Sequence, residues 1–244
     1  MIIDNSTGKI LSTISIGGKN VVSIQDHTTG KYLYWTPASP VADFTGVRLM
    51  RYNGEVITLS QWQNDSIPVR EAVGVAIGDG TSATGHRFCL FKTFMKNSSA
   101  KPCQFTATNT VIIPNMVTET AYANAIADFA GKANTQAVLD ALANHTITTA
   151  NVAEYCHGIW SPWGDRGYIP SAGQMKMMFD NASDINDCMT YIGGDSFVTA
   201  NTEFYWTSTQ YNANAVWGKV ASVNNQLNKV ASSNAYKGLA VFDY

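Results

Sequence analysis

Short apolar runs separated by glycine turns fill the first 68 residues, and this pattern predicts β-strands. The turn signals are "SIGGKN", "HTTGKY" and "RYNGEV". In the last of these, Asn53 and Gly54 separate two apolar runs, which favours a type I′ hairpin. We expect a small β module over residues 1–68, with strands at residues 21–24, 31–35, 47–52 and 55–59.

Two strongly apolar runs, "EAVGVAIGDG" and "HRFCLFKTF", open the remainder of the chain. The loop between them contains Gly78, Gly80 and Gly85, which do not have the GxGxxG spacing. A strand follows this loop, whereas a phosphate-binding loop leads into a helix N-terminus. The pattern therefore predicts a β-hairpin rather than a phosphate site.

Helical spacing takes over in the middle of the chain. Tyr122, Ile126, Phe129 and Ala133 recur every three or four residues, which places them on one face of a helix. Gly131 is the expected end of this helix. Further helices are expected over residues 135–142 and 149–158.

The clearest helix start is "PSAGQ", in which Ser171 and Gln174 have the spacing of a capping box. A shorter helix is expected from Asp184 until Gly193, a residue type that commonly ends helices. The methionines of both helices are expected to fill the core rather than to bind a cofactor.

Strand patterns return after the helices, at residues 204–208, 215–221 and 239–242. The order of strands, helices and strands lacks the alternation of βαβ units. We therefore predict an α+β domain over residues 69–244, preceded by the small N-terminal β module.

Charge is scarce in this chain, and this narrows the classes of partner. Charged residues make up 14% of the 244 residues, against about 25% in an average soluble domain, and the net charge is -2. The absence of a basic run argues against nucleic acid as a partner. No run approaches the length of about 20 apolar residues that a membrane helix needs, so no membrane insertion is expected.

The N-terminal sequence "MIIDNSTGKI" lacks the basic and apolar pattern of a signal peptide. We expect the chain to be made in the cytoplasm, and either to stay inside the cell or to leave it by lysis or a dedicated route. A chain shortened at its start is the alternative.

Reactive side chains form no recognisable catalytic or metal motif. The four cysteines have no CxxC pair and no histidine spacing suited to zinc, and neither GxSxG nor HExxH occurs. His27, His86, His145 and His157 are scattered. We predict no catalytic residue, metal or cofactor. Buried free thiols are expected, with the pairs Cys89–Cys103 and Cys156–Cys188 as alternative disulfides.

The stretch "YWTSTQYNANAVWGKVASVNNQLNKVASSNAY" is rich in Asn, Ser, Tyr and Gln. Tyrosine offers a large contact area at low entropy cost, while Ser and Asn make adaptable hydrogen bonds. Because neighbouring strand residues face opposite sides, an inward Trp206 places Tyr205 outward. We predict a binding surface made of Tyr205, Tyr211, Asn212, Asn214, Asn224, Asn225, Gln226, Asn228, Ser232, Ser233, Asn234 and Tyr236. Ordinary solvated turns are the alternative reading.

A second conspicuous stretch is "WSPWGDRGYIP", which contains Trp160, Trp163, Asp165 and Arg166. We expect a structured loop in which Asp165 pairs with Arg166. A binding pocket is the alternative.

Five motifs occur in an order that resembles a known family: "AVGVAIGDG…FCLF", "DFAGKANT", "EYC…GDRGYIPSAGQM", "INDCMTYIGG" and "YWTSTQYNANAVW". Together they resemble C-type-lectin-fold domains of the formylglycine-generating-enzyme-like branch. The end of the chain resembles the variable proteins of diversity-generating retroelements, which are frequent in gut bacteria and their phages. The resemblance covers residues 70–244.

The resemblance implies a lectin-like fold that displays a C-terminal surface whose residues are rewritten by targeted mutagenesis. It further implies a receptor-binding or adhesin protein on a phage tail or a cell surface, with a cell-surface protein or a glycan as its partner. The N-terminal module would mount the domain or form a homo-oligomer.

The chain departs from the family pattern in three ways. It ends in "YKGLAVFDY", so Lys237 takes the place of an arginine found in many relatives. It has no cysteine after Cys188, so the activity of the formylglycine-generating enzymes is not carried over. "SQWQND" is only superficially similar to a calcium-lectin motif. An enzyme of the formylglycine-generating or hydrolytic kind, and a structural surface subunit, are the alternatives to a binding protein.

Overall fold

A computed structural model describes residues 43–80, 85–107, 110–200, 202–218, 226–231 and 235–244, together with six short strands among the first 33 residues. These six strands form three antiparallel pairs. They are β1 (Ile2–Ile3) with β2 (Ile10–Leu11), β3 (Ser15–Ile16) with β4 (Lys19–Asn20), and β5 (Ile24–Gln25) with β6 (Tyr32–Leu33).

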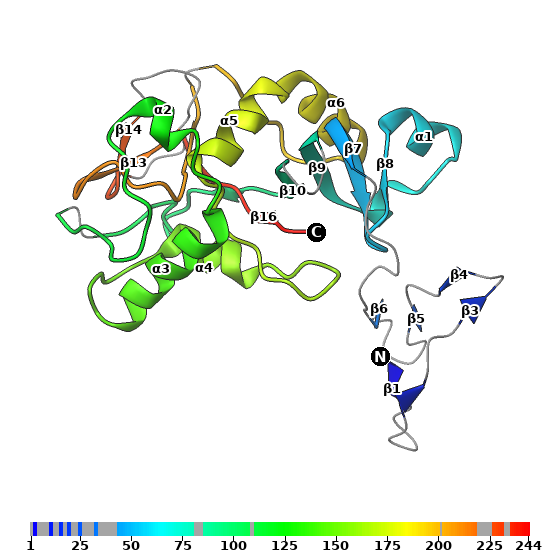
Figure 1. The fold of residues 1–244 in the computed structure, drawn as a ribbon, viewed down its shortest axis with the longest axis horizontal. Helices are drawn as coiled ribbons and strands as arrows, with labels where there is room; N and C mark the ends of the chain where they lie inside the picture. The colour runs from blue at the N-terminus through cyan, green and yellow to red at the C-terminus, as the bar shows by residue number, and fades with distance from the viewer. Residues whose placement is uncertain are drawn as a thin grey trace.

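The centre of the fold is a five-stranded antiparallel sheet with the order β16-β10-β9-β7-β8. Its strands are β7 (Phe44–Arg51), β8 (Val56–Ile57), β9 (Ala72–Gly80), β10 (Arg87–Phe91) and β16 (Val241–Phe242). The predicted hairpin of the two apolar runs is confirmed, since β9 and β10 pair over five residues. The sheet thus joins β7, which begins at residue 44, to β16 at residues 241–242, although the two strands are far apart in sequence (Figure 1).

The predicted boundary between residues 68 and 69 cuts through this sheet. β7 pairs with β9 from Phe44↔Gly80 to Arg51↔Ala72, so residues 44–57 belong to the same sheet as the following strands. The helix α1 (Leu59–Asn64) then buries Trp62 completely in the core beneath the sheet. The strands predicted at residues 47–52 and 55–59 overlap β7 and β8, but α1 was not predicted. Strand periodicity carries no information about which sheet a strand joins.

The turn between β7 and β8 is a hairpin, as predicted, but not of type I′. Gly54 has a φ of 79°, whereas Asn53 does not have a positive φ, and a type I′ turn needs both. Gly54 N donates to Arg51 O at 2.9 Å, and Arg51 N donates to Glu55 O at 2.9 Å. This is a three-residue hairpin loop whose single left-handed position is taken by glycine.

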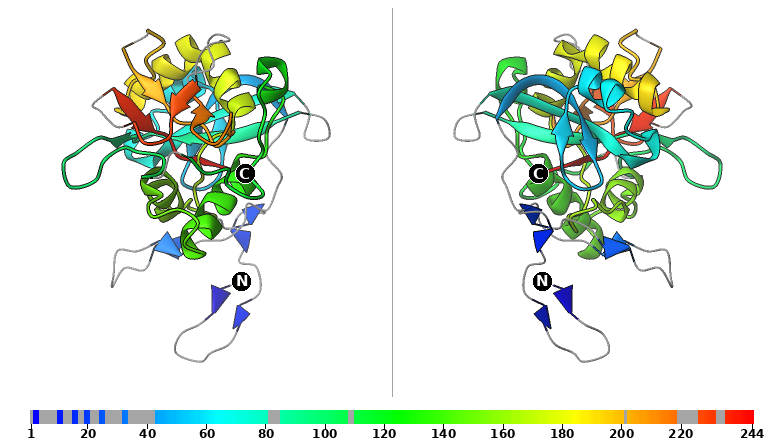
Figure 2. Two further views of the ribbon diagram at one scale, coloured as in Figure 1. Left: turned by 90° about the vertical axis from the view of Figure 1, so that its left-hand side faces the viewer. Right: turned by 90° about the vertical axis from the view of Figure 1, so that its right-hand side faces the viewer.

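Helices lie on both sides of the central strands (Figures 1 and 2). The longer ones are α3 (Gly131–Ala143), α4 (Asn151–Gly158), α5 (Ala172–Asp180) and α6 (Ala182–Ile192). Two shorter elements are η1 (Val69–Glu71) and α2 (Tyr122–Ala125). α5 and α6 cover one side, where α6 packs on β7 and β9, and α3 and α4 lie on the other side.

Helix boundaries were predicted well where a capping signal was present. Ser171 and Gln174 form the predicted capping box of α5, and Gly193 ends α6 with a φ of 68°. The predicted role of Gly131 is wrong, because this glycine begins α3 rather than ending a helix. The chain turns between α2 and α3 at Asp128, whose Oδ1 accepts a hydrogen bond from Ala130 N at 2.8 Å.

Two smaller sheets complete the described fold. One has the order β11 (Met95–Lys96), β15 (Tyr236–Gly238), β12 (Phe204–Tyr205), and the other pairs β13 (Ala215–Trp217) with β14 (Gln226–Asn228). Strands from both halves enclose a helical middle, so the predicted α+β class is confirmed. All four cysteines are buried and free, as expected, so neither alternative disulfide forms.

Candidate functional site

A buried polar segment, residues 207–210, underlies the predicted binding surface. Each of its four polar side chains is fully buried. Thr207 Oγ1 donates to Trp217 O at 2.6 Å, and Ser208 Oγ donates to Ile169 O at 3.0 Å. Buried hydroxyl groups need such partners to offset their desolvation. The polar residues of "TSTQ" are therefore part of the buried frame, by which we mean the hydrogen-bonded residues that support the surface, and not part of the surface itself.

Asp128 anchors the same segment to the helical side of the fold. Its Oδ2 accepts hydrogen bonds from Thr209 Oγ1 at 2.6 Å and from Asn134 Nδ2 at 2.9 Å. Thr209 Oγ1 in turn accepts one from Ala172 N, at the start of α5. Segment 207–210 is thus fixed against two helices.

Lys229 is fully buried, and its ammonium group connects three separate segments. Nζ donates to Val111 O at 2.7 Å, to Gln210 Oε1 at 2.5 Å and to Ala213 O at 3.1 Å. All three acceptors are neutral, and burial lowers the pKa of Lys229 to about 8. This residue holds the loops around residues 111 and 213 onto the frame.

The pair of β13 and β14 has one face that is fully buried and a second face, here called the outer face, that is buried at Trp217 and reaches the solvent at Asn228. Val216 pairs with Leu227, and both side chains are buried in the core. Side chains alternate along a strand, so Trp217 and Ala215 lie on the other face with their partners Gln226 and Asn228.

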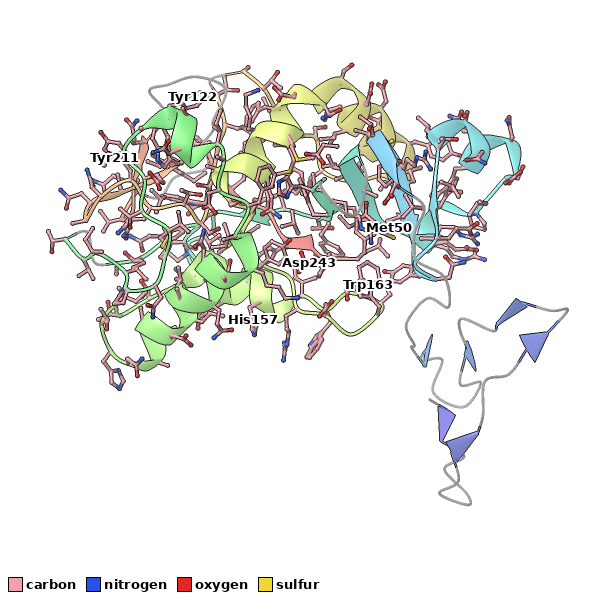
Figure 3. The ribbon with its side chains drawn as sticks, viewed as in Figure 1. Met50, Tyr122, His157, Trp163, Tyr211 and Asp243 are labelled. Carbon is pink, nitrogen blue, oxygen red and sulfur yellow. The ribbon has the colours of Figure 1, made fainter. Side chains whose placement is uncertain are left out.

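Trp217 is covered on this outer face by two partly exposed tyrosines. The ring centroid of Tyr211 lies 5.4 Å from that of Trp217, and the centroid of Tyr122 lies 6.0 Å from it. Trp217 Nε1 donates to Glu119 O at 2.7 Å, which fixes the indole in place. Figure 3 shows Tyr122 and Tyr211 together at this end of the molecule.

The outer face continues into exposed amide side chains. Asn212, Asn214 and Asn228 are exposed, and Lys229 N donates to Asn214 O at 3.0 Å, which holds the loop beside β14. Ile112 is 51% exposed. On one side of it Val111 O accepts a hydrogen bond from Lys229, and on the other side Ile113 N donates one to Gln210. We call this set the tip surface: Ile112, Tyr122, Tyr211, Asn212, Asn214, Gln226 and Asn228.

Two of the predicted contact asparagines also shape the backbone. Asn212 Oδ1 accepts hydrogen bonds from Asn214 N at 2.8 Å and Ala215 N at 3.0 Å. Asn228 Oδ1 accepts one from Val230 N at 3.1 Å. These are turn-forming bonds of the kind that asparagine side chains make to the backbone that follows them. The alternative reading of these residues as turn formers is therefore correct in part.

The predicted outward orientation of Tyr205 is wrong. Tyr205 is fully buried, and its hydroxyl accepts a hydrogen bond from Val198 N at 2.6 Å and donates one to Glu203 Oε2 at 3.0 Å. Tyr205 and Trp206 belong to two different hydrophobic clusters. Both faces of this strand are covered, so alternation along it does not expose either residue.

The other predicted contact residues divide into two groups. Tyr236 is half-buried, stacks on Trp206 at 5.1 Å and pairs with Phe204, so it belongs to the β11-β15-β12 sheet and not to the hairpin. Asn224, Asn225, Ser232, Ser233 and Asn234 lie outside the described residues. Of the predicted segments, 211–214 and 226–228 are brought together.

Three residues important for this site were missed from the sequence: Ile112, Tyr122 and Lys229. Tyr122 was assigned to a core helix face because its spacing matched Ile126. Lys229 did have a signal, since it is the one charged residue in "NNQLNKVASSNAY". A lysine isolated in a neutral segment with strand character indicates either an exposed strand or a buried ammonium group.

The "WSPWGDRGYIP" loop is structured, as expected, but through different contacts. The guanidinium of Arg166 lies 3.4 Å from the ring centroid of Trp160, and its Nη1 donates to His157 O at 3.2 Å. Asp165 pairs with Lys132 at 3.6 Å instead of with Arg166. Trp163 Nε1 donates to Asp243 O at 2.9 Å.

The described residues contain no group of three or more His, Cys, Asp or Glu side chains placed to hold a metal ion. Burial raises the pKa of Cys103 to about 12 and that of Cys188 to about 11, which disfavours the nucleophilic thiolate. Among the described helices, none has the length and apolar character needed to cross a membrane.

Comparison with known proteins gives little further information. No protein-family model and no curated protein matches the chain. Among solved structures, a fimbrial protein from Bacteroides ovatus ATCC 8483 is similar with a TM-score of 0.49 and 11% sequence identity. The match covers 83% of this chain and 48% of that protein, so the chain spans about half of its length.

Proposed function

We propose that the chain is a non-enzymatic binding protein that meets its partner through the tip surface. The observation that carries this proposal is the division between frame and surface. Lys229, Trp217 and the polar segment 207–210 are buried and hydrogen-bonded, while the neighbouring tyrosines and amides reach the solvent. A fixed backbone bearing such side chains loses little entropy on binding.

The chemistry of the tip surface indicates the kind of contact that it makes. Its polar residues are amides and phenols without formal charge, and Ile112 adds an exposed apolar side chain. Tyrosines in such a setting act as contact anchors, and the amides adjust to the partner. A neutral region of a cell-surface protein or of a glycan fits this chemistry.

The finer identity of the protein rests on the resemblance of residues 70–244. We propose a C-type-lectin-like domain of the type found in variable proteins of diversity-generating retroelements, presented on a phage tail or on a cell surface. Asn214 suits diversification, because its side chain is exposed and none of the described hydrogen bonds of the frame depends on it. The neighbouring DNA should then encode a reverse transcriptase and a near-copy of the C-terminal coding segment. Absence of both would remove diversification from the proposal.

Binding itself is tested with fluorescently labelled protein on a panel of intact gut-bacterial strains, read by flow cytometry. The double variant Tyr211→Ala/Asn214→Ala should lose most of the binding, while its melting temperature stays close to that of the wild type. Gln136→Ala, an exposed change on α3, is the matched control and should bind normally. Undiminished binding by the double variant would show that the tip surface is not the contact.

A further inference from the structure

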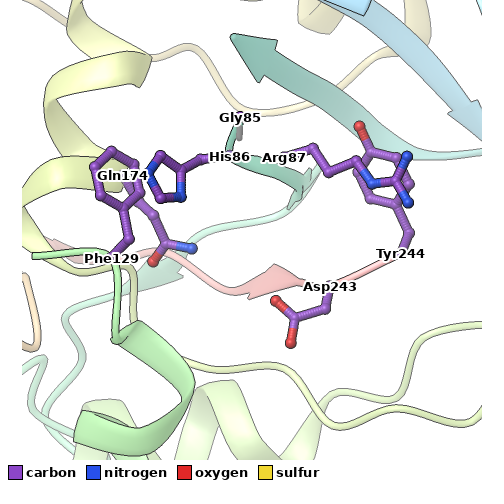
Figure 4. A pocket seen from close by; sticks show the side chains of 7 residues that line it. All are labelled: Gly85, His86, Arg87, Phe129, Gln174, Asp243 and Tyr244. Carbon is purple, nitrogen blue, oxygen red and sulfur yellow. The ribbon is translucent and has the colours of Figure 1, made fainter. Parts of the chain in front are cut away.

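A small cavity lies among elements other than those of the tip surface. Its volume is about 290 Å³, and its lining includes His86 and Arg87 at the start of β10, Phe129 before α3, Gln174 on α5, and Asp243 at the end of the chain (Figure 4). This volume is at the lower limit of the roughly 300–1,000 Å³ of drug-sized sites. It suits a ligand the size of one sugar ring or one amino acid.

Both charged groups of the lining already have ion-pair partners. Asp243 pairs with Lys132 at 3.1 Å, and Arg87 pairs with Asp43 at 3.9 Å. A charged ligand would compete with these pairs, whereas a neutral ligand would use the remaining lone pairs and N–H groups. The cavity therefore favours a neutral, hydrogen-bonding ligand over an ion or a zwitterion.

The orientation of the polar groups is fixed by a chain of hydrogen bonds. Gln174 Nε2 donates to the hydroxyl of Tyr168 at 3.0 Å, and that hydroxyl donates to Asp243 Oδ1 at 2.6 Å. The primary amide has a second N–H, and the carboxylate has further lone pairs. His86, whose ring stacks on Phe129, adds an imidazole at the same edge. The lining therefore offers both donors and acceptors, and a sugar hydroxyl group can use either.

An exposed aromatic ring belongs to a loop that is attached to the cavity rim. Trp160 is 55% exposed, and the guanidinium of Arg166 occupies one face of its ring. Lys132 bridges Asp165 of this loop, at 3.6 Å, to Asp243 of the cavity, at 3.1 Å. An exposed indole offers an apolar face to the C–H side of a pyranose ring, whose hydroxyl groups point outward.

We propose that this cavity binds the terminal pyranose of a neutral oligosaccharide, and that the following sugar contacts Trp160. Asp243, Gln174 and His86 make hydrogen bonds to the sugar hydroxyl groups. The loop of Trp160 extends the site beyond the cavity. This site shares no residue with the tip surface, so a failed test of one proposal leaves the other unaffected.

The test is a titration of ¹⁵N-labelled full-length protein, followed by NMR, with methyl pyranosides of glucose, galactose, mannose, N-acetylglucosamine and fucose. At least one should shift the backbone amides of His86, Arg87 and Asp243 in a saturable way. A β-linked disaccharide ending in that sugar should also shift the indole N–H of Trp160.

His86→Ala and Asp243→Asn should each weaken the binding by at least tenfold, and Gln136→Ala should leave it unchanged. Both changed side chains are at least partly exposed, so the variants are expected to fold. The proposal is overturned if none of the five sugars shifts these amides, if the shifts map elsewhere, or if both variants bind like the wild type.

Discussion

Lys229 Nζ lies 2.5 Å from Gln210 Oε1, and both side chains are fully buried. The contact joins the end of β14 to the polar segment that precedes the exposed loop. Gln210 Nε2 extends the connection to Thr118 Oγ1 at 2.8 Å. The loops that carry the tip surface are thus held from beneath by an ammonium group and an amide, and not by apolar packing alone.

Lys229→Met should destabilise the protein by about 2–3 kcal/mol at pH 7, because Val111 O and Ala213 O lose a buried donor and Gln210 Oε1 keeps only Ile113 N. Lys176→Met, which removes a partly exposed helix-surface pair, should cost no more than about 0.5 kcal/mol. Urea unfolding of the three proteins measures both values. An equal cost for the two lysines would contradict the assigned role of Lys229.

The same variant predicts a pH dependence. The native pKa of Lys229, about 8, lies below the ordinary value of 10.5. Between these values the unfolded chain holds a proton that the native chain has released, so rising pH favours the native state. Ionisation of the buried cysteines and tyrosines opposes this trend equally in wild type and variant. The difference in free energy of unfolding between the wild type and Lys229→Met should therefore increase by on the order of 1 kcal/mol from pH 8 to pH 10. A constant difference would contradict the lowered pKa.

Asn212→Ala should cost about 1 kcal/mol, since two backbone N–H groups lose their acceptor. Asn214→Ala should change stability by less than about 0.5 kcal/mol, as expected at an exposed position. Asn212→Asp, which keeps the acceptor oxygen, should remain close to the wild type. Thermal melts separate these outcomes, and equal effects at residues 212 and 214 would show that the turn does not depend on Asn212.

Trp217→Ala should cost roughly 3–5 kcal/mol, because the indole is buried and its N–H is bonded to Glu119 O. Tyr211→Ala removes an edge contact with Trp217 and part of the packing at the rim of the core, and it should cost about 1 kcal/mol. Denaturant unfolding measures both. If Tyr211→Ala were as costly as Trp217→Ala, the tyrosine would belong to the frame and not to the surface.

The four cysteines should be unreactive in the native protein. All are buried, and burial raises the pKa of Cys103 to about 12. Ellman's reagent at pH 8 should therefore label none of them in the folded protein within minutes and all four in guanidinium chloride. Rapid labelling of one thiol without denaturant would reveal a reactive cysteine and revive the enzyme alternative.

The local elements of this fold were predictable because their signals are local. The capping box at Ser171, the stop at Gly193 and the hairpin of β9 and β10 each depend on residues close together in the chain. The role of Gly131 was predicted wrongly because glycine is tolerated at the start of a helix as well as at its end. Its position was decided by the turn at Asp128, a contact that sequence spacing does not reveal.

The candidate site was predicted in part, and the errors have one cause. Segments 211–214 and 226–228 were correctly expected to converge. Tyr205 was placed outward by alternation with Trp206, and the burial of segment 207–210 was not predicted. Burial of polar side chains depends on distant partners such as Asp128, Ile169 and Val198. The alternation of residues along a strand shows which side chains share a face. It does not show whether other parts of the protein cover that face.

The pairing of β10 with β16 joins Cys89 to Phe242 and Leu90 to Val241. Contacts between residues so far apart in sequence slow folding, because a long loop must close before they form. During synthesis, β10 leaves the ribosome long before its partner exists. Until residues 241–242 emerge, one edge of β10 stays unpaired and open to association with other chains. The nascent chain should therefore be most prone to aggregation in the interval before residues 241–242 emerge.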